Sequence, residues 1–338
     1  MNANSIRPPL ILALGLMGLL ITLAIAPAIG GTKVHWQQVW AYWSGKTSSS
    51  GVIVFKLRLP RVVLSILVGG ALGVAGAVLQ ALLRNPLATP YTLGISSGGA
   101  LGAVLALKLG WVVSWWGFGS VQIAAFLGSI GTIFIVYELA RRWLRFSIYA
   151  LILIGVTLSF FFGALILLIH YLADFTQTQQ MIRWMIGGLD VVGFQHILGM
   201  MPVIGVLIFY LWRLSVPLNL ISFSPLIASS KGVAVKQVQK QTFIAASLLT
   251  GSVVAISGPI GFVGLIVPHA IRLVMGPDLR WLIPAAFLTG GIFLAWADTL
   301  ARTVLAPINL PVGIITAMVG GPAFLYLLLR NPPQNIDE

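Results

Sequence analysis

Long apolar runs alternate with short clusters of charged residues, glycine and proline along almost the whole chain. A run of about 20 apolar residues can cross the hydrocarbon core of a bilayer as one helix. Taking the clusters as span ends gives about ten helices, at residues 10–30, 62–83, 92–108, 118–137, 148–171, 194–212, 242–257, 258–270, 282–301 and 311–329. The pattern therefore predicts an all-α polytopic membrane protein, with some helices short or broken, forming a single transmembrane domain over residues 1–338.

Composition and charge agree with this prediction. The chain is 58% hydrophobic and 8% charged, whereas about a quarter of the residues in a soluble domain are charged. Its net charge is +13, but the basic residues are scattered between the apolar runs, which argues against nucleic-acid binding. The loops assigned to the cytoplasm carry a modest excess of Lys and Arg, so the positive-inside rule favours placing both termini there.

Proline and glycine indicate where the second and third spans begin and how they pack. Arg58 and Arg61 bracket Pro60, whose fixed φ and missing N–H suit the first turn of a helix, so we expect a helix to start near Pro60. Small residues four apart on one helix face let backbones approach closely in lipid, so we expect both helices inside the bundle. The packing and break residues here are Gly69, Gly73, Asn85, Pro86, Gly94 and Gly98.

A further break is expected within residues 242–270. The basic loops on both sides are assigned to the cytoplasm, yet the stretch is too short for two full crossings at a rise of about 1.5 Å per residue. A bent pair, one longer helix and one short one, solves this. Broken helices are tolerated where protein or a water-filled cavity covers the freed backbone groups, so we expect a pathway or a subunit interface beside it. The break residues are Gly258, Pro259, Gly261, Gly264 and Pro268.

The longest polar stretch on the cytoplasmic side is residues 214–241. Ser224 is a good helix N-cap, Pro225 suits the first helical position, and Gly232 supplies a stop. This pattern predicts a short helix over 225–231 and a second helical start near residue 234. From the residues alone, an ordinary amphipathic connector explains the stretch equally well.

Several of these motifs together resemble a known family. The RLPR sequence at 58–61, Asn-Pro-Leu-Ala at 85–88 and the stretch 258–269 are similar to permease subunits of bacterial ABC importers for ferric siderophores, haem and cobalamin, and shorter matches follow at 276–280 and 310–313. The resemblance implies a type II importer permease in the bacterial inner membrane, paired as a homodimer or with a homologous permease. It also implies two cytoplasmic ATPase subunits, which hold ATP and Mg, and a periplasmic or extracellular substrate-binding protein.

Three arginines fall on the outer side in this topology, Arg58, Arg61 and Arg302. Snorkelling of long cationic side chains to the membrane interface explains them without any function. Asp298 lies four residues before Arg302, which predicts an ion pair on one helix face. The resemblance implies instead that the three arginines form an outward cationic rim that pairs with glutamates of the binding protein and docks it.

The resemblance also makes residues 214–241 the loop that couples the permease to its ATPase. Family members usually have acidic residues where this chain has Ser229, Ser230 and Lys231. The coupling residues are expected to be Ser224, Pro225, Leu226, Ile227, Ala228, Ser229, Ser230, Lys231, Gly232 and Val233. We further expect the helices at 92–108 and 148–171 to line the substrate path, with a cytoplasmic gate near Ser147.

Other functional classes are less favoured by the residues. An ion-gradient-driven secondary transporter or channel is expected to carry intramembrane acids or polar ion ligands, and Asp298 is its main candidate. A membrane enzyme needs a cluster of catalytic side chains, and a metal site needs grouped ligands, but the four histidines occur singly and cysteine is absent. Gly45-Lys46-Thr47 lacks the earlier glycine of a phosphate-binding loop, because Trp40 stands there. The substrate stays open among ferric siderophores, haem, cobalamin and an oxyanion.

Overall fold

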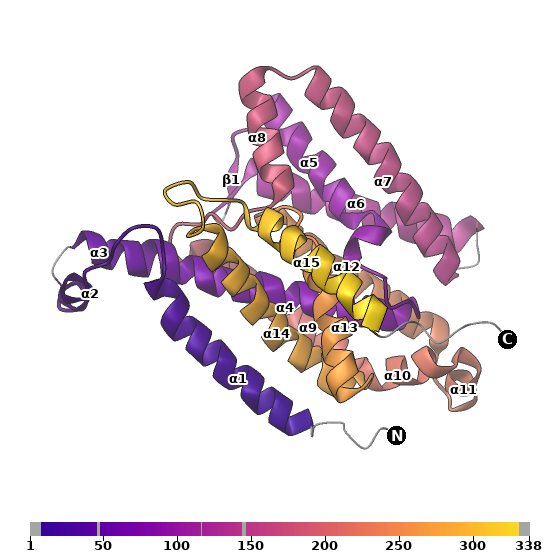
Figure 1. Cartoon of the computed structure of the whole chain (residues 1–338). Coiled ribbons are helices and arrows are strands. Elements are labelled where there is room, and N and C mark those ends of the chain that lie inside the picture. Colours follow the sequence, from indigo (N-terminus) through magenta and orange to yellow (C-terminus); the bar gives the residue numbers. More distant parts are fainter. Residues whose placement is uncertain (1–7, 46–47, 116, 144–146, 331–338) are drawn as a thin grey trace.

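The computed structural model describes residues 8–45, 48–115, 117–143 and 147–330, most of which lie in helices (Figure 1). Lys46 and Thr47, which belong to the Gly45-Lys46-Thr47 motif, lie outside the described residues. The two chain ends, which the charge pattern places in the cytoplasm, lie outside them as well. Within them, 7 helices are long and apolar enough to cross a membrane, and shorter apolar helices accompany these. Together they coincide with the predicted spans, so the prediction of an all-α polytopic membrane fold is confirmed.

The long helices are α1 (Pro8–Ile25), α4 (Leu59–Leu82), α6 (Ser120–Trp143), α7 (Ile148–Tyr171), α9 (Gln195–Arg213), α12 (Val235–Ser257) and α14 (Leu279–Ala301). The shorter apolar helices are α5 (Ile95–Leu109), α13 (Val263–Met275) and α15 (Val312–Arg330). The connections contain η1 (Ala26–Ala28), α2 (Trp36–Trp43), α3 (Ser49–Val52), η2 (Ile53–Arg58), η3 (Pro90–Leu93), α8 (Phe175–Ile186), α10 (Ser215–Phe223) and α11 (Pro225–Ser230). Strands β1 (Ser114–Trp115) and β2 (Phe118–Gly119) pair antiparallel.

Helix α4 is the central helix of the bundle. Residues 64–83 are all buried, and α4 packs against α12, α13 and α14 (Figure 1). Its glycines face the backbones of these neighbours: a Cβ added at Gly73 would lie 2.5 Å from the carbonyl oxygen of Ala286, and one at Gly69 would meet the carbonyl of Gly290. The prediction that small residues place this helix inside the bundle is therefore confirmed.

Glycines at and near the start of α5 likewise allow close packing against neighbouring helices. Gly94, directly before it, has a φ of +76°, a left-handed conformation that glycine adopts without a steric cost. A Cβ added at Gly94 would lie 2.7 Å from the carbonyl oxygen of Gly155 in α7, and one at Gly98 would meet Thr132 in α6. Close backbone approach thus fixes α5 between α6 and α7.

The predicted helix start near Pro60 agrees with the start of α4 at Leu59, but the sequence missed that α3 and η2 precede it, so helical chain runs unbroken from Ser49 into α4. The Ser48 side chain caps this earlier start by accepting a hydrogen bond from the Gly51 N–H at 3.1 Å. Residues 53–58 form a π-helical turn directly before α4. Pro60 lies in the first turn of α4 after that irregular segment, so its missing N–H does not end the helix.

The predicted break after residue 257 is confirmed, since α12 ends at Ser257 and α13 begins at Val263. Protein covers the freed backbone groups, as a break at membrane depth requires. The Tyr91 hydroxyl donates to the Ile260 carbonyl and accepts from the Ile260 N–H at 2.8 Å. The Gly188 N–H donates to the Ser257 carbonyl at 2.8 Å. The Gly261 position is open, because a Cβ added there meets no atom within 4 Å.

The first third of the predicted polar stretch 214–241 is not a loop. Residues 215–223 form α10, whose Leu218 and Ile221 are fully buried and which packs against α4 and α14. The flanking polar and basic residues made the segment resemble a connector. Its apolar residues recur at helical spacing, and this was the signal that could have identified it.

Candidate functional site

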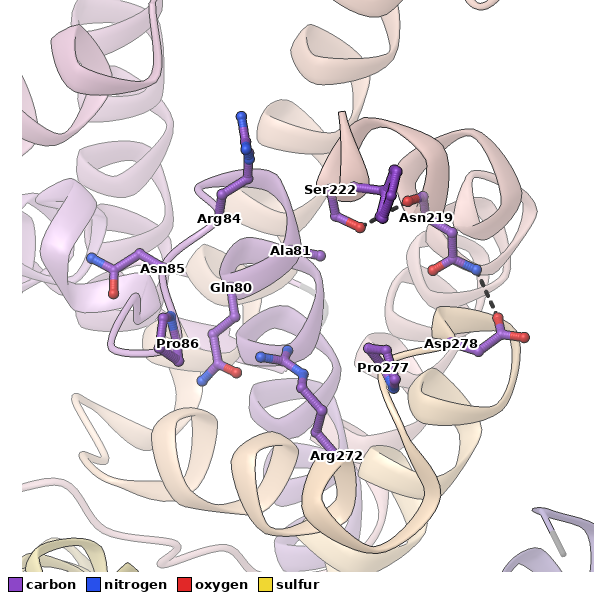
Figure 2. Close-up of a pocket in the computed structure, with 11 residues that line it drawn as sticks. Gln80, Ala81, Arg84, Asn85, Pro86, Asn219, Ser222, Arg272, Pro277 and Asp278 are labelled. Atoms are coloured by element: carbon purple, nitrogen blue, oxygen red, sulfur yellow. Dashed lines mark hydrogen bonds between the residues drawn. The ribbon is translucent and has the colours of Figure 1, made fainter. Parts of the chain in front are cut away.

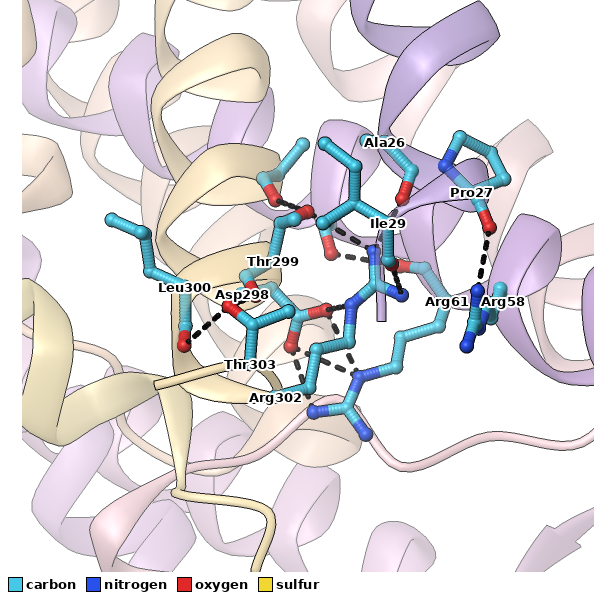
Figure 3. A network of polar contacts seen from close by, with 12 residues as sticks. Ala26, Pro27, Ile29, Arg58, Arg61, Asp298, Thr299, Leu300, Arg302 and Thr303 are labelled. Atoms are coloured by element: carbon cyan, nitrogen blue, oxygen red, sulfur yellow. Dashed lines mark hydrogen bonds and ion pairs between the residues drawn. The ribbon is translucent and has the colours of Figure 1, made fainter. Parts of the chain in front are cut away.

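A network of charged side chains joins α4 and α14 near the ends of these helices that are predicted to lie outside (Figure 3). Asp298, in α14, is completely buried. Arg61, in α4, donates from Nε to its Oδ1 at 3.0 Å and from Nη2 to the same oxygen at 2.8 Å. Arg302 Nε lies 3.4 Å from Asp298 Oδ2. The predicted ion pair with Arg302 is confirmed, and Arg61 is a second partner that the sequence did not reveal.

Arg58 and Arg302 are turned inward and hold the chain after α1. Each is only 6% exposed. Arg58 Nη2 donates to the Thr32 carbonyl at 2.6 Å, and Arg302 donates to the carbonyls of Ala26 and Ile29 at 2.8 Å. The side chains of these two therefore do not form an outward rim, because backbone carbonyls of residues 26–32 bind their guanidinium groups. The predicted docking role of the three arginines stays a prediction.

Arg61 makes the contact of this network that faces solvent. Its Nη1 donates to Asp190, in the connection after α8. The Asp190 side chain is 82% exposed, whereas that of Arg61 is 12% exposed. Arg61 therefore links a buried carboxylate on one edge of its guanidinium to an accessible one on the other.

The opposite end of the bundle carries the segment predicted to contact an ATPase, residues 224–233. Ser224 Oγ accepts a hydrogen bond from the Ile227 N–H at 3.4 Å, and the helix that follows, α11, ends at Ser230. Gly232 has a φ of +80°. The predicted capped helix and glycine stop are therefore confirmed. Phe223 and Leu226 are 77% and 80% exposed, and exposed apolar groups of this kind mark interaction surfaces.

Comparison with known proteins places this arrangement in a family. Residues 18–330 match the FecCD transport family. The chain belongs to this family. Over 335 residues it is 36% identical to the Hemin transport system permease protein HmuU of Yersinia pestis, covering 97% of this chain and 98% of HmuU. Over 314 residues it is 36% identical to the Vitamin B12 import system permease protein BtuC of Klebsiella pneumoniae subsp. pneumoniae, covering 93% and 91%.

A solved structure supports the same assignment of this FecCD chain. It is described as an inward-facing conformation of a metal-chelate type ABC transporter, and it matches with a TM-score of 0.84 at 31% identity. The match covers 96% of this chain and 100% of the other. The resemblance seen in the sequence, to permease subunits of ABC importers for iron chelates, haem and cobalamin, is therefore confirmed.

The predicted gate residue, Ser147, and the predicted path-lining helix α7 can both be located in the structure. Ser147 caps α7, because its Oγ accepts a hydrogen bond from the Ala150 N–H at 3.1 Å. Helix α7 leaves large apolar side chains uncovered, among them Phe160, Phe161 and Leu167. These observations do not test a gate at Ser147 or a path along α5 and α7, which stay predictions.

Proposed function

We propose that this chain is the membrane-spanning permease of an ABC importer that takes a metal chelate or a cobalamin from a substrate-binding protein and releases it in the cytoplasm. The observation that carries the proposal is the family match, which spans nearly the whole helical bundle. Relatives named for hemin and vitamin B12 transport support this substrate class. The permease itself performs no covalent chemistry, and ATP and Mg bind to the partner ATPase.

The assembly that we infer contains a second permease copy, or a homologous permease, with two ATPase subunits. The uncovered apolar face of α7 supports a partner in the membrane, although lipid also covers such a face. The complex lies in the bacterial inner membrane with both permease termini in the cytoplasm. ATP binding and hydrolysis then shift the permease between inward-open and outward-open states, because the partners contact these states differently.

Docking of the binding protein involves Arg58, Arg61 and Arg302 in two ways. Arg61 is the arginine whose guanidinium meets an exposed group, Asp190, so it offers the direct contact to an acidic side chain. Arg58 and Arg302 bind the carbonyls of residues 26–32 and so hold the surface around it. Complementary charge at such a surface steers and orients a partner.

Coupling to the ATPase involves residues 224–233 within the loop 214–241. The Ser224 side chain caps the start of α11, and exposed Leu226 gives the helix an apolar face. Helix α10 packs against both α11 and α4, so a displacement of α11 by the ATPase reaches the central helix through direct contacts. Two distant sites can be coupled through packed elements that adopt two alternative arrangements.

An uptake experiment tests the proposal. The permease and its co-purified ATPase are placed in proteoliposomes, with the binding protein outside, ion gradients collapsed, and ATP either trapped in the lumen or omitted. Radiolabelled ferric siderophore, haem and cobalamin are offered separately. We expect ATP-dependent accumulation of one of them. Transport that persists without ATP and follows an imposed ion gradient would reject the proposal in favour of a secondary transporter.

A further inference from the structure

A cavity of about 730 Å³ lies where α4 ends, between α10, α13 and the turn before α14 (Figure 2). Its lining includes Gln80, Arg84, Asn219, Phe223 and Arg272. None of these residues belongs to the charge network around Asp298 or to the segment 224–233. The cavity lies beside that segment, at the end of the bundle that we place in the cytoplasm.

The cavity presents two cations without a counter-charge. The guanidinium groups of Arg84 and Arg272 make no hydrogen bond or ion pair with any residue that the structure describes. The carboxylate in the cavity wall, Asp278, is already occupied, since it binds Arg280 at 2.7 Å and accepts from Asn219 Nδ2 at 2.7 Å. A half-buried guanidinium is best satisfied by a carboxylate or a phosphate. The cavity is therefore suited to one additional anionic group.

Gln80 adds a second requirement. It is buried, and its Nε2 donates to the Leu265 carbonyl at 3.2 Å. Its Oε1 is buried and has no hydrogen-bond partner among the described residues. Figure 2 shows the Arg272 side chain reaching toward Gln80 inside the cavity. An unpaired buried acceptor is costly, so the floor of the cavity favours a polar over an apolar occupant.

The position of the cavity favours a protein occupant over a lipid. Phe223 lines the cavity and is exposed, and the next residue, Ser224, caps α11. A protein seated on α11 therefore also covers the mouth of the cavity. Lipid headgroups also bind basic pockets between transmembrane helices on the cytoplasmic side, so a lipid is the alternative outcome of the test below.

We propose that the cavity receives an acidic side chain from the ATPase subunit. Its carboxylate binds the Arg272 guanidinium, and Arg84 lies at the rim of the cavity. The inference rests on the proposed function, because it requires an ATPase partner on this face. It adds a charge-dependent contact to the apolar contact on α11. The ATPase thereby also touches α4 and α13 directly.

Binding of the ATPase to the full-length permease in nanodiscs tests this site. We expect Arg272→Gln to weaken ATPase affinity by about tenfold or more, because an acidic side chain would lose its buried partner, and to reduce the salt dependence of binding. Arg142→Gln is the matched control. Arg142 is an exposed cation at the predicted cytoplasmic end of α6, already paired with Glu138, so its loss should change affinity less than about twofold.

A cross-linking experiment identifies the occupant. Arg272→Lys keeps the positive charge and introduces an amine that a carbodiimide joins to a carboxylate in direct contact. We expect a permease–ATPase cross-link that maps to position 272 and to one acidic residue of the ATPase. The Arg142→Lys variant should give no such product.

Two outcomes would overturn the inference, and they separate it from the proposed function. If the wild-type permease binds its ATPase but Arg272→Gln binds equally well, the cavity is not an ATPase contact, while the importer assignment stands. If Arg272→Gln instead removes bound phosphatidylglycerol in native mass spectrometry at unchanged ATPase affinity, the anion is a lipid headgroup. A wild-type permease that binds no ATPase would contradict the proposed function itself.

Discussion

Arg61 and Asp298, separated by 237 positions in the sequence, form a two-pronged hydrogen-bonded ion pair that joins α4 to α14. Asp298 is completely buried, and Arg302 provides a second guanidinium 3.4 Å away. Two fixed guanidinium groups hold this fully buried carboxylate in place between the two helices. The network is therefore better explained as a structural anchor than as a proton relay.

Asp298→Asn should destabilise the permease strongly. The substitution removes the negative charge that faces Arg61 and Arg302 and leaves Arg61 with only the exposed Asp190 as a partner. Breaking a buried ion pair costs about 3–5 kcal/mol. Thermal stability in detergent measures the effect. Asp190→Asn is the control, because Asp190 is largely exposed and such a pair contributes about 1 kcal/mol or less. Equal stability of the two variants would contradict the anchoring role.

Asp190 should compete with the binding protein for Arg61. It already occupies the accessible edge of the Arg61 guanidinium, so an incoming carboxylate must displace it. We expect Asp190→Asn to tighten binding-protein affinity several-fold, measured on nanodisc-embedded permease at low and high salt. Asp174→Asn removes the same charge from another exposed position predicted to lie on the outer face, the cap of α8. If both variants tighten binding equally, the effect is long-range electrostatics and not release of Arg61.

Gly76→Ala should disrupt the packing of the central helix. A Cβ at position 76 would fall onto the backbone of Gly264 in α13, with its Cα at 2.8 Å, so α13 would have to move. Overpacking of this kind typically costs about 1–3 kcal/mol. Gly131→Ala in α6 is the matched control, because a Cβ there meets no atom within 4 Å and alanine favours a helix by up to about 1 kcal/mol. Thermal stability of both variants in detergent provides the comparison, and a stable Gly76→Ala protein would contradict the packing argument.

Local patterns in the sequence were sufficient for much of this fold. The ends of α7 and α12, the cap at Ser224 and the break after Ser257 each depend on a few neighbouring residues whose preferences agree with the final structure. Helix α10 was missed because it has 9 residues, fewer than a span needs, and lies among polar neighbours. Its burial against α4 and α14 arises from tertiary packing, which local sequence patterns do not show.

The site was less accessible from the sequence, because its contacts are long-range. The spacing of Asp298 and Arg302 predicts their ion pair, since helix geometry alone brings them together. Nothing local indicates that Arg61 is the closer partner, or that Arg58 turns inward to the carbonyls of residues 26–32. The cavity at Arg272 depends on α10, α13 and the turn before α14 meeting at the end of α4, which a one-dimensional pattern does not specify.

The turn before α14 should make a pH-dependent contribution to stability through Asp278. Hydrogen bonding from the Arg280 side chain, followed by the Arg280 backbone and Asn219, holds the pKa of Asp278 below its usual value. A lowered pKa in the folded state means that the stabilisation is complete above the ordinary carboxylate pKa of about 4 and is lost as the pH falls through the lowered value. Asp278→Asn keeps a good helix cap, so it removes mainly the charge.

The stability difference between wild type and Asp278→Asn therefore measures this contribution. We expect a constant difference at pH 6–8, and a difference that shrinks toward zero under strongly acidic conditions, because protonated Asp278 then resembles the neutral variant. The difference should stay small throughout, since the Asp278 side chain is 31% exposed and water screens the pair with Arg280. A difference that grows on acidification would mean that Asp278 binds protons more readily in the folded state, which contradicts the hydrogen bonds seen at this turn.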